Sequence, residues 1–167
     1  MGRVDLESAV GKVPIAGTWR TTAPADDLWA VVADLSTWPA WWPAIQGVEL
    51  LAGTAEAPEA ARLTFDTPRP LPPLEVDLEV VEHVAPTRLA IRSQGGLLTG
   101  SGKLTVAPDG GGSKVDYDLR LSVRSLLLRP LELILSGATR AGGRERLHRA
   151  GDDLARLAGG EPGRHEP

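Results

Sequence analysis

The sequence predicts an α+β fold in which a curved antiparallel sheet of about seven strands wraps around a long C-terminal helix. Three observations support this prediction. A helical segment follows the first strand, a run of segments with alternating apolar residues fills the middle of the chain, and after that run the apolar period lengthens to three and four residues. Strands gathered in one run, with helices before and after them, are typical of α+β folds.

The composition is that of one ordinary globular domain. Of the 167 residues, 42% are hydrophobic and 24% are charged, a balance that argues against disorder over most of the chain. The absence of cysteine excludes disulfides and thiolate metal sites. A net charge of −4 without a long basic run argues against a nucleic-acid partner. No segment holds 18 consecutive apolar residues, so we expect no stable membrane insertion and a cytoplasmic location.

The first elements are a strand over residues 13–21 and a helix over about 24–35. Apolar and bulky side chains alternate loosely in the strand, as they do where one face is buried. Pro24 suits the first turn of a helix, and two aspartates follow it at the positive end of the helix dipole. Two short helices are therefore expected after the first strand, the second of them within the next segment.

That next segment, LSTWPAWWP at residues 35–43, holds three of the five tryptophans of the chain. Because a residue before proline is disfavoured in the α region, we expect Trp38 to end the first helix and Trp42 to end a short turn. The segment is then a tight corner. Each tryptophan side chain can bury roughly 150 to 250 Å², so the cluster either fills a core or forms the wall of a cavity.

A meander of antiparallel strands follows the corner. In the segment LEVDLEVVEH apolar residues alternate with acidic ones, which is the clearest strand pattern in the chain. The turn-forming segments QGG and PDGGG join the later strands. The expected strands are 48–51, 62–66, 74–83, 88–93, 97–106 and 114–123.

A long amphipathic helix is expected between Ser125 and Gly159, and a disordered tail over 159–167. Within that helix, the segment SGATRAGG has only small side chains apart from its arginine, and Gly142 with Gly143 costs about 2 kcal/mol of helix propensity relative to alanine. Two explanations stay open. The segment either separates two shorter helices or thins one helix above a ligand.

The segment APADDLWAVVADLSTWPAWWP resembles the opening block of the START-like, or SRPBCC, superfamily, and most closely its bacterial polyketide cyclase/dehydrase-type branch. The resemblance lies in a proline-started helix with Trp29, then Asp34, then a corner formed by Pro39, Trp41 and Pro43. The strand GSGKLTVAP, the strand KVDYDLRLSV and the helix end GDDLARLAG extend it over residues 13–158.

This resemblance implies a helix-grip fold, with residues 1–158 as a single START-like ligand-binding domain. It also implies a deep, mainly apolar cavity between the sheet and the C-terminal helix, which holds a lipid, a polyketide or another hydrophobic small molecule. By the same resemblance, Trp41 packs under the first helix as structure, whereas Trp42 or Trp38 could reach the end of the cavity. Members of the superfamily include carriers, sensors and cyclases, so function has to be argued from the site.

The candidate ligand-binding residues are those expected to face the cavity from the corner, the strands and the last helix. They are Trp42, Phe65, Leu78, Ile91, Leu98, Gly100, Tyr117, Leu119, Leu135, Ala138 and Gly142. Tyr117 is the one large polar residue on the inward faces and the catalytic candidate, as an acid or a hydrogen-bond donor. The commoner explanation for such a residue is a buried tyrosine whose hydroxyl finds a partner.

Motifs for other chemistry are missing from the sequence. The three histidines lie on different elements and form neither a metal-ligand set nor a catalytic pair, although His83 could face the cavity mouth. The sequence has no phosphate-binding loop and no inward pair of carboxylates. We therefore expect no metal and no cofactor.

Three functions remain in view. The first hypothesis is binding or carriage of a hydrophobic small molecule without catalysis. The second is a polyketide aromatase/cyclase or dehydratase that uses Tyr117, and the third is a protein-interaction module with a vestigial cavity. A cluster of three or more polar residues around Tyr117 would favour catalysis, whereas a bare apolar lining would favour carriage. The sequence leaves the ligand and the oligomeric state open.

Overall fold

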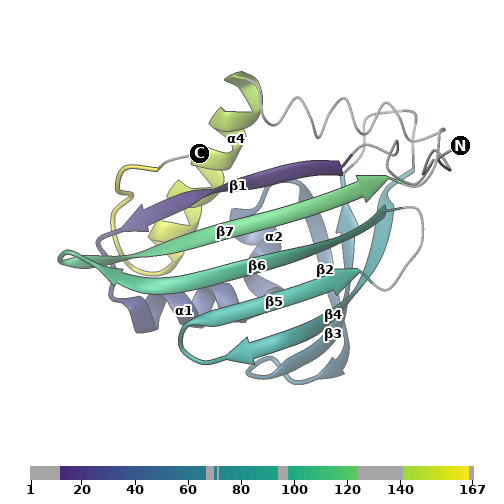
Figure 1. Cartoon of the computed structure of the whole chain (residues 1–167), viewed down its shortest axis with the longest axis horizontal. Coiled ribbons are helices and arrows are strands. Elements are labelled where there is room, and N and C mark those ends of the chain that lie inside the picture. The colour runs from purple at the N-terminus through teal and green to yellow at the C-terminus, as the bar shows by residue number, and fades with distance from the viewer. Residues whose placement is uncertain (1–11, 67–69, 71, 94–97, 124–140, 166–167) are drawn as a thin grey trace, which may run out of the picture.

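The computed structural model describes residues 12–66, 70, 72–93, 98–123 and 141–165 of the chain. Seven strands and a few helices make up this part of the molecule (Figure 1). Their bounds are β1 (Lys12–Thr21), α1 (Ala25–Ala33), η2 (Leu35–Thr37), α2 (Trp38–Trp41), β2 (Ile45–Gly53), β3 (Pro58–Phe65), β4 (Leu74–Val84), β5 (Arg88–Ser93), β6 (Leu98–Asp109), β7 (Gly112–Val123) and α4 (Ala141–Leu157).

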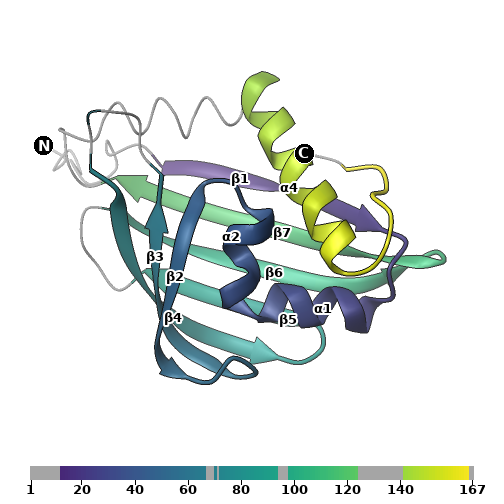
Figure 2. The same ribbon diagram turned by 180° about the vertical axis from the view of Figure 1, so that it is seen from behind.

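The strands form one sheet in the order β1-β7-β6-β5-β4-β3-β2, and every neighbouring pair is antiparallel. Figure 2 shows that α1, α2 and α4 all lie on one face of this sheet, which we call the inner face. The opposite, outer face is turned toward the viewer in Figure 1. This arrangement confirms the predicted α+β class, the two short helices after the first strand and the closing helix.

A bulge in β4 changes which of its residues face inward. The first half of the strand alternates between buried and more exposed residues, as the sequence predicts. The register then shifts between Val80 and Glu82. As a result Val81 is 48% exposed, and His83 pairs directly with the buried Leu89, which places it on the inner face.

Helix α1 ends before the tryptophan-rich corner begins. Its last residue is Ala33, after which Asp34 adopts an extended conformation, with φ −86° and ψ 97°. The carboxylate of Asp34 accepts a hydrogen bond at 3.1 Å from the backbone N–H of Ser36, which caps the short η2 turn. The local capping of η2, rather than a proline, therefore marks the end of α1.

The prediction that Trp38 ends the first helix is consequently wrong. Trp38 begins α2 with helical angles, φ −56° and ψ −38°. Pro39 occupies the first turn of α2, where its missing N–H is not needed. Trp42 is extended before Pro43, with φ −106° and ψ 99°, and ends α2 as predicted.

Three tryptophans lie at the centre of the hydrophobic core. Trp19, Trp38 and Trp41 are each no more than 2% exposed. The indole N–H of Trp38 donates to the carbonyl of Val32 at 3.0 Å, and that of Trp41 donates to Thr37 Oγ1 at 3.3 Å. These hydrogen bonds hold the corner against α1 and agree with the structural role expected for Trp41.

The segment after α4, residues 159–165, runs back along the edge of β1, so the prediction of a disordered tail is corrected there. Gly159 has φ 85°, a left-handed conformation that suits glycine and ends the helix. The N–H of Thr22 then donates to Glu161 O at 3.0 Å, and the N–H of Gly163 donates to Arg20 O at 2.8 Å. The unpaired edge of β1 supplies these partners, which composition alone does not reveal.

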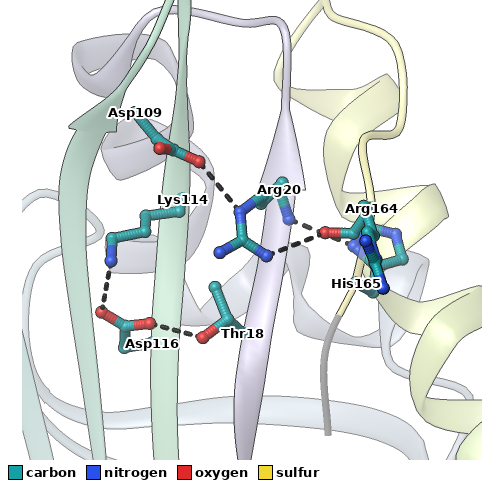
Figure 3. Close-up of polar contacts among 7 residues, drawn as sticks. All are labelled: Thr18, Arg20, Asp109, Lys114, Asp116, Arg164 and His165. Atoms are coloured by element: carbon teal, nitrogen blue, oxygen red, sulfur yellow. Dashed lines mark hydrogen bonds and ion pairs between the residues drawn. The ribbon is translucent and has the colours of Figure 1, made fainter.

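Arg20 connects this C-terminal segment to the β6–β7 hairpin (Figure 3). Its side chain pairs with Asp109 at 2.9 Å and donates to the carbonyl of Arg164 at 3.1 Å. Its backbone N–H donates to Nδ1 of His165 at 3.1 Å. A neighbouring group of polar contacts on the outer face consists of Thr18, Asp116 and Lys114.

Candidate functional site

A cavity of about 70 Å³ lies beneath α2, against the inner face of the sheet. Its lining residues come from the corner and from β2 to β7. They are Trp38, Trp42, Ile45, Leu63, Phe65, Val76, Leu78, Ile91, Ser93, Thr99, Gly100, Ser101, Gly102 and Leu119.

Two tryptophans from the corner form the wall of the cavity opposite the sheet. The rings of Trp38 and Trp42 lie with their centroids 5.8 Å apart. The ring of Trp42 also contacts Trp41 at 5.5 Å and Trp19 at 6.0 Å. Trp42 is only partly buried, so it is the member of this aromatic cluster that can present a rigid, well-supported surface to a ligand.

The sheet side of the cavity follows the register of the central strands. Gly102 of β6 pairs with Ile91 of β5 on one side and with Leu119 of β7 on the other. All three line the cavity. The alternation of side chains along each strand therefore brings these residues from three strands into one row.

The lining is almost entirely apolar, and none of the described lining residues is charged. Three of them carry hydroxyl groups, Ser93, Thr99 and Ser101, but Ser101 lies across from Arg92 and Arg120 on the outer face, so its backbone rather than its hydroxyl faces the cavity. The hydroxyl of Thr99 lies 3.4 Å from the carbonyl of Ser122, within reach of a weak hydrogen bond. Because a buried charge without a partner is strongly unfavourable, this lining favours an uncharged, hydrophobic ligand.

Tyr117 does not line the cavity, which corrects the expectation that it does. It is 3% exposed, and its ring packs on Trp19 with centroids 4.2 Å apart and an angle of 30° between the planes. Its direct neighbours across the strands are Leu104 and Gly17, neither of which has a polar side chain. Burial raises the pKa of Tyr117 to about 12, so its hydroxyl stays protonated at neutral pH.

The residues of the last helix that were predicted to cover the cavity lie outside the described part of the chain, apart from the backbone of Gly142. In the described part of α4, no residue lines the cavity. Instead α4 packs beside β1 and α2, where Gly151 lies directly against the ring of Trp19. The corner around α2, rather than this part of the C-terminal helix, faces the sheet across the cavity.

Six of the predicted ligand-binding residues line the cavity, namely Trp42, Phe65, Leu78, Ile91, Gly100 and Leu119. Leu135 and Ala138 lie outside the described residues, and so do the side chain of Leu98 and the surroundings of Gly142. The candidate set omitted several lining residues. Alternation along the strands identifies Leu63, Val76 and Gly102 as inward-facing, and the resemblance offered Trp38 as the alternative to Trp42 at the cavity end.

The histidines lie away from the cavity. His83 contacts Trp29 of α1 at a ring distance of 5.4 Å and does not line the cavity, contrary to the alternative that placed it at the mouth. His165 accepts the N–H of Arg20 at Nδ1, so its Nε2 carries the proton and donates to Asp152 at 2.7 Å. Within the described ranges, no three histidine or carboxylate side chains group closely enough to hold a metal ion.

Comparison with known proteins identifies a family and a fold. The family model described as polyketide cyclase/dehydrase and lipid transport matches residues 15–158. No curated protein sequence matches the chain. Among solved structures, a START superfamily protein from Mycobacterium smegmatis is 20% identical, with a TM-score of 0.67 over 89% of this chain and 98% of the other.

Two further solved structures are similar over the same 89% of this chain. A protein from Deinococcus radiodurans is 25% identical, with a TM-score of 0.56 and 95% of its own chain covered. The Zhui aromatase/cyclase from Streptomyces sp. R1128 is 14% identical, with a TM-score of 0.66 and 94% of its chain covered. Their shared architecture confirms the predicted helix-grip fold.

Proposed function

The chain belongs to the polyketide cyclase/dehydrase and lipid transport family, and on that premise we propose that it binds or carries a hydrophobic small molecule in the cavity beneath α2. The membership confirms the resemblance to the START-like superfamily. We infer a lipid-like or polyketide-like ligand, since both are hydrophobic and the family description includes both.

The observation that carries this proposal is the uncharged lining of the cavity. Aliphatic side chains from β3, β4, β5 and β7 line it together with Trp42, and the few hydroxyl groups leave most of the lining without hydrogen-bonding capacity. Burial of apolar ligand surface there contributes roughly 25 cal/mol per Å² to binding before the entropic costs of association. A mainly apolar pocket with a few polar groups is the usual form of a small-molecule site.

The surroundings of Tyr117 support carriage over cyclisation. A cyclase needs a group that moves a proton and a donor that stabilises the developing enolate. Tyr117 packs against Trp19 instead of lining the cavity, and the two residues opposite it in the sheet are apolar or glycine. The cluster of polar groups that would have favoured catalysis is not found among these neighbours.

The third hypothesis, an interaction module with a vestigial cavity, is less well supported. The cavity is open beneath Trp42, and two of its lining residues, Gly100 and Gly102, contribute no side-chain volume to it. In a sheet, glycine is unfavourable unless something requires the space. The retained space favours an occupant over a collapsed core.

Two measurements test the proposal. Purified full-length protein is examined by native mass spectrometry and organic extraction for a co-purified hydrophobe, and it is titrated with the fluorescent hydrophobe 1-aminoanthracene. We expect a bound hydrophobe or a saturable 1:1 complex with the probe, and competition by palmitate or by a fused-ring phenol such as alizarin identifies the ligand class. A protein that carries no hydrophobe and binds none of these three compounds would overturn the proposal.

A further inference from the structure

Gly102 occupies an unusual place, the interior of the internal strand β6. It pairs with Ile91 and Leu119 on its two sides, so β6 is hydrogen-bonded to neighbours along both edges there. A glycine in such a position weakens a strand, because it has the most backbone freedom to lose and no side chain to pack. The packing around Gly102 explains its presence.

The space that a side chain at Gly102 would occupy is already taken. A Cβ atom there would lie 2.8 Å from Leu119 Cδ2, and 3.2 and 3.4 Å from Ile91 Cγ1 and Cδ1. These atoms are the outer parts of flexible side chains that both line the cavity. Leu119 and Ile91 thus lean over the glycine instead of standing upright in the cavity.

The side chains along β6 change in size at the end of the cavity. Gly100 and Gly102 line it, whereas Leu104 and Val106, the next two residues on the same face, are each 2% exposed within the core and do not. Figure 2 shows α1 over the half of β6 that leads into the β6–β7 hairpin. The cavity therefore lies where β6 lacks side chains and stops where they begin.

We propose that Gly102 is a specificity-determining residue, which sets the depth of the cavity and so the largest ligand that it accepts. This inference rests on the proposed binding function. Any side chain at Gly102 displaces Leu119 and Ile91. Ile15 pairs with Leu119 on the next strand, and Val80 pairs with Ile91 on the other side. These two side chains fill the positions farther along the same row of the sheet, so the displaced Leu119 and Ile91 turn into the cavity.

The test compares Gly102→Ala with Gly47→Ala. Gly47 also lies in a strand, but a Cβ atom there has no neighbour within 4 Å, so it controls for replacing a strand glycine. The probes are 1-aminonaphthalene, with two fused rings, and 1-aminoanthracene, with three. One methylene in a hydrophobic pocket changes discrimination between ligands by about tenfold or more. We therefore expect Gly102→Ala to lower the affinity for the larger probe by at least about tenfold relative to the affinity for the smaller one. Gly47→Ala should leave both affinities within about threefold.

A second variant keeps the test decisive if Gly102→Ala does not fold. Leu119→Ala adds no atom to the strand and removes one of the side chains that lean over Gly102, so it should shift preference toward the three-ring probe. Equal changes for both probes in the folded variants would overturn the role of Gly102 while leaving binding intact. Failure of the wild-type protein to bind either probe would instead count against the proposed function itself.

Discussion

The ring of Tyr117 packs on the ring of Trp19 at a centroid distance of 4.2 Å, which joins the middle of β7 to the C-terminal half of β1 inside the core. The Tyr117–Trp19 pair lies outside the cavity, since neither residue lines it. It also removes the tyrosine from any direct contact with a ligand in that cavity. The relationship leads to two predictions for one residue.

Tyr117 is the one tyrosine of the chain, so ultraviolet absorbance at 295 nm reports its ionisation alone. We expect a midpoint near pH 12, because burial raises the pKa to about that value from 10.0. The raised pKa means that the native state holds the proton more tightly than the unfolded chain. The corresponding stability is present below pH 10 and is lost as the pH rises toward 12.

The expected alkaline loss of stability is measured by urea unfolding at pH 9, 10, 11 and 12. In Tyr117→Phe this part of the decline should be absent, and 1-aminoanthracene binding at pH 7 should stay within about tenfold, since one neutral hydrogen bond contributes about 0.5 to 1.5 kcal/mol. A tyrosinate absorbance that rises fully near pH 10 in the folded protein would show that Tyr117 is exposed.

The two tryptophans at the end of the corner should differ in effect. Trp41→Ala should lower the free energy of unfolding by about 3 to 5 kcal/mol, because Trp41 is 1% exposed in the core. Trp42→Ala removes part of the cavity wall and should lower the affinity for 1-aminoanthracene by about tenfold or more. Urea unfolding and probe titration of both variants check this difference. Wild-type affinity in a folded Trp42→Ala protein would refute ligand contact by Trp42.

Gly151 of α4 should not tolerate alanine, although alanine is the better helix former by about 1 kcal/mol. A Cβ atom there would lie 2.8 Å from Cγ of Trp19 and closer still to Cδ1 of the same ring. A rigid buried indole cannot move aside easily, so Gly151→Ala should destabilise the protein by about 1 to 3 kcal/mol. Thermal and urea unfolding measure the change, with Gly111→Ala as the control because a Cβ atom at Gly111 meets open space. A stabilised Gly151→Ala protein would mean that α4 packs less closely on β1.

The attachment of the C-terminal segment to β1 should depend on the imidazole of His165. Nδ1 of this ring accepts the N–H of Arg20 where a main-chain carbonyl would act in a regular strand pair. His165→Ala should therefore lower stability by about 0.5 to 1.5 kcal/mol and accelerate hydrogen exchange at the Arg20 amide. Arg164→Ala is the matched control, because Arg164 contacts Arg20 through its carbonyl, which the substitution keeps. Unchanged exchange at Arg20 in His165→Ala would show that the segment does not need the ring.

Local patterns in the sequence were sufficient to predict the strands and much of the candidate site. Alternation with a period of two residues is a property of each strand by itself, so it placed Leu78, Ile91 and Leu119 on the face that holds the cavity. The family resemblance, rather than a local pattern, placed Trp41 in the core and offered Trp42 or Trp38 as the cavity residue. The predictions from alternation hold because side-chain direction along a strand is set within a few residues.

Tertiary structure decided which inward residues meet a cavity and which meet another side chain. Tyr117 and Leu119 lie on the same face of β7, yet Leu119 lines the cavity while Tyr117 meets Trp19 from the other end of the chain. The C-terminal segment, rich in glycine and proline, is held by the free edge of β1. The sequence determined faces and elements because these follow from local periodicity, whereas the cavity and the edge contacts depend on distant segments packed together.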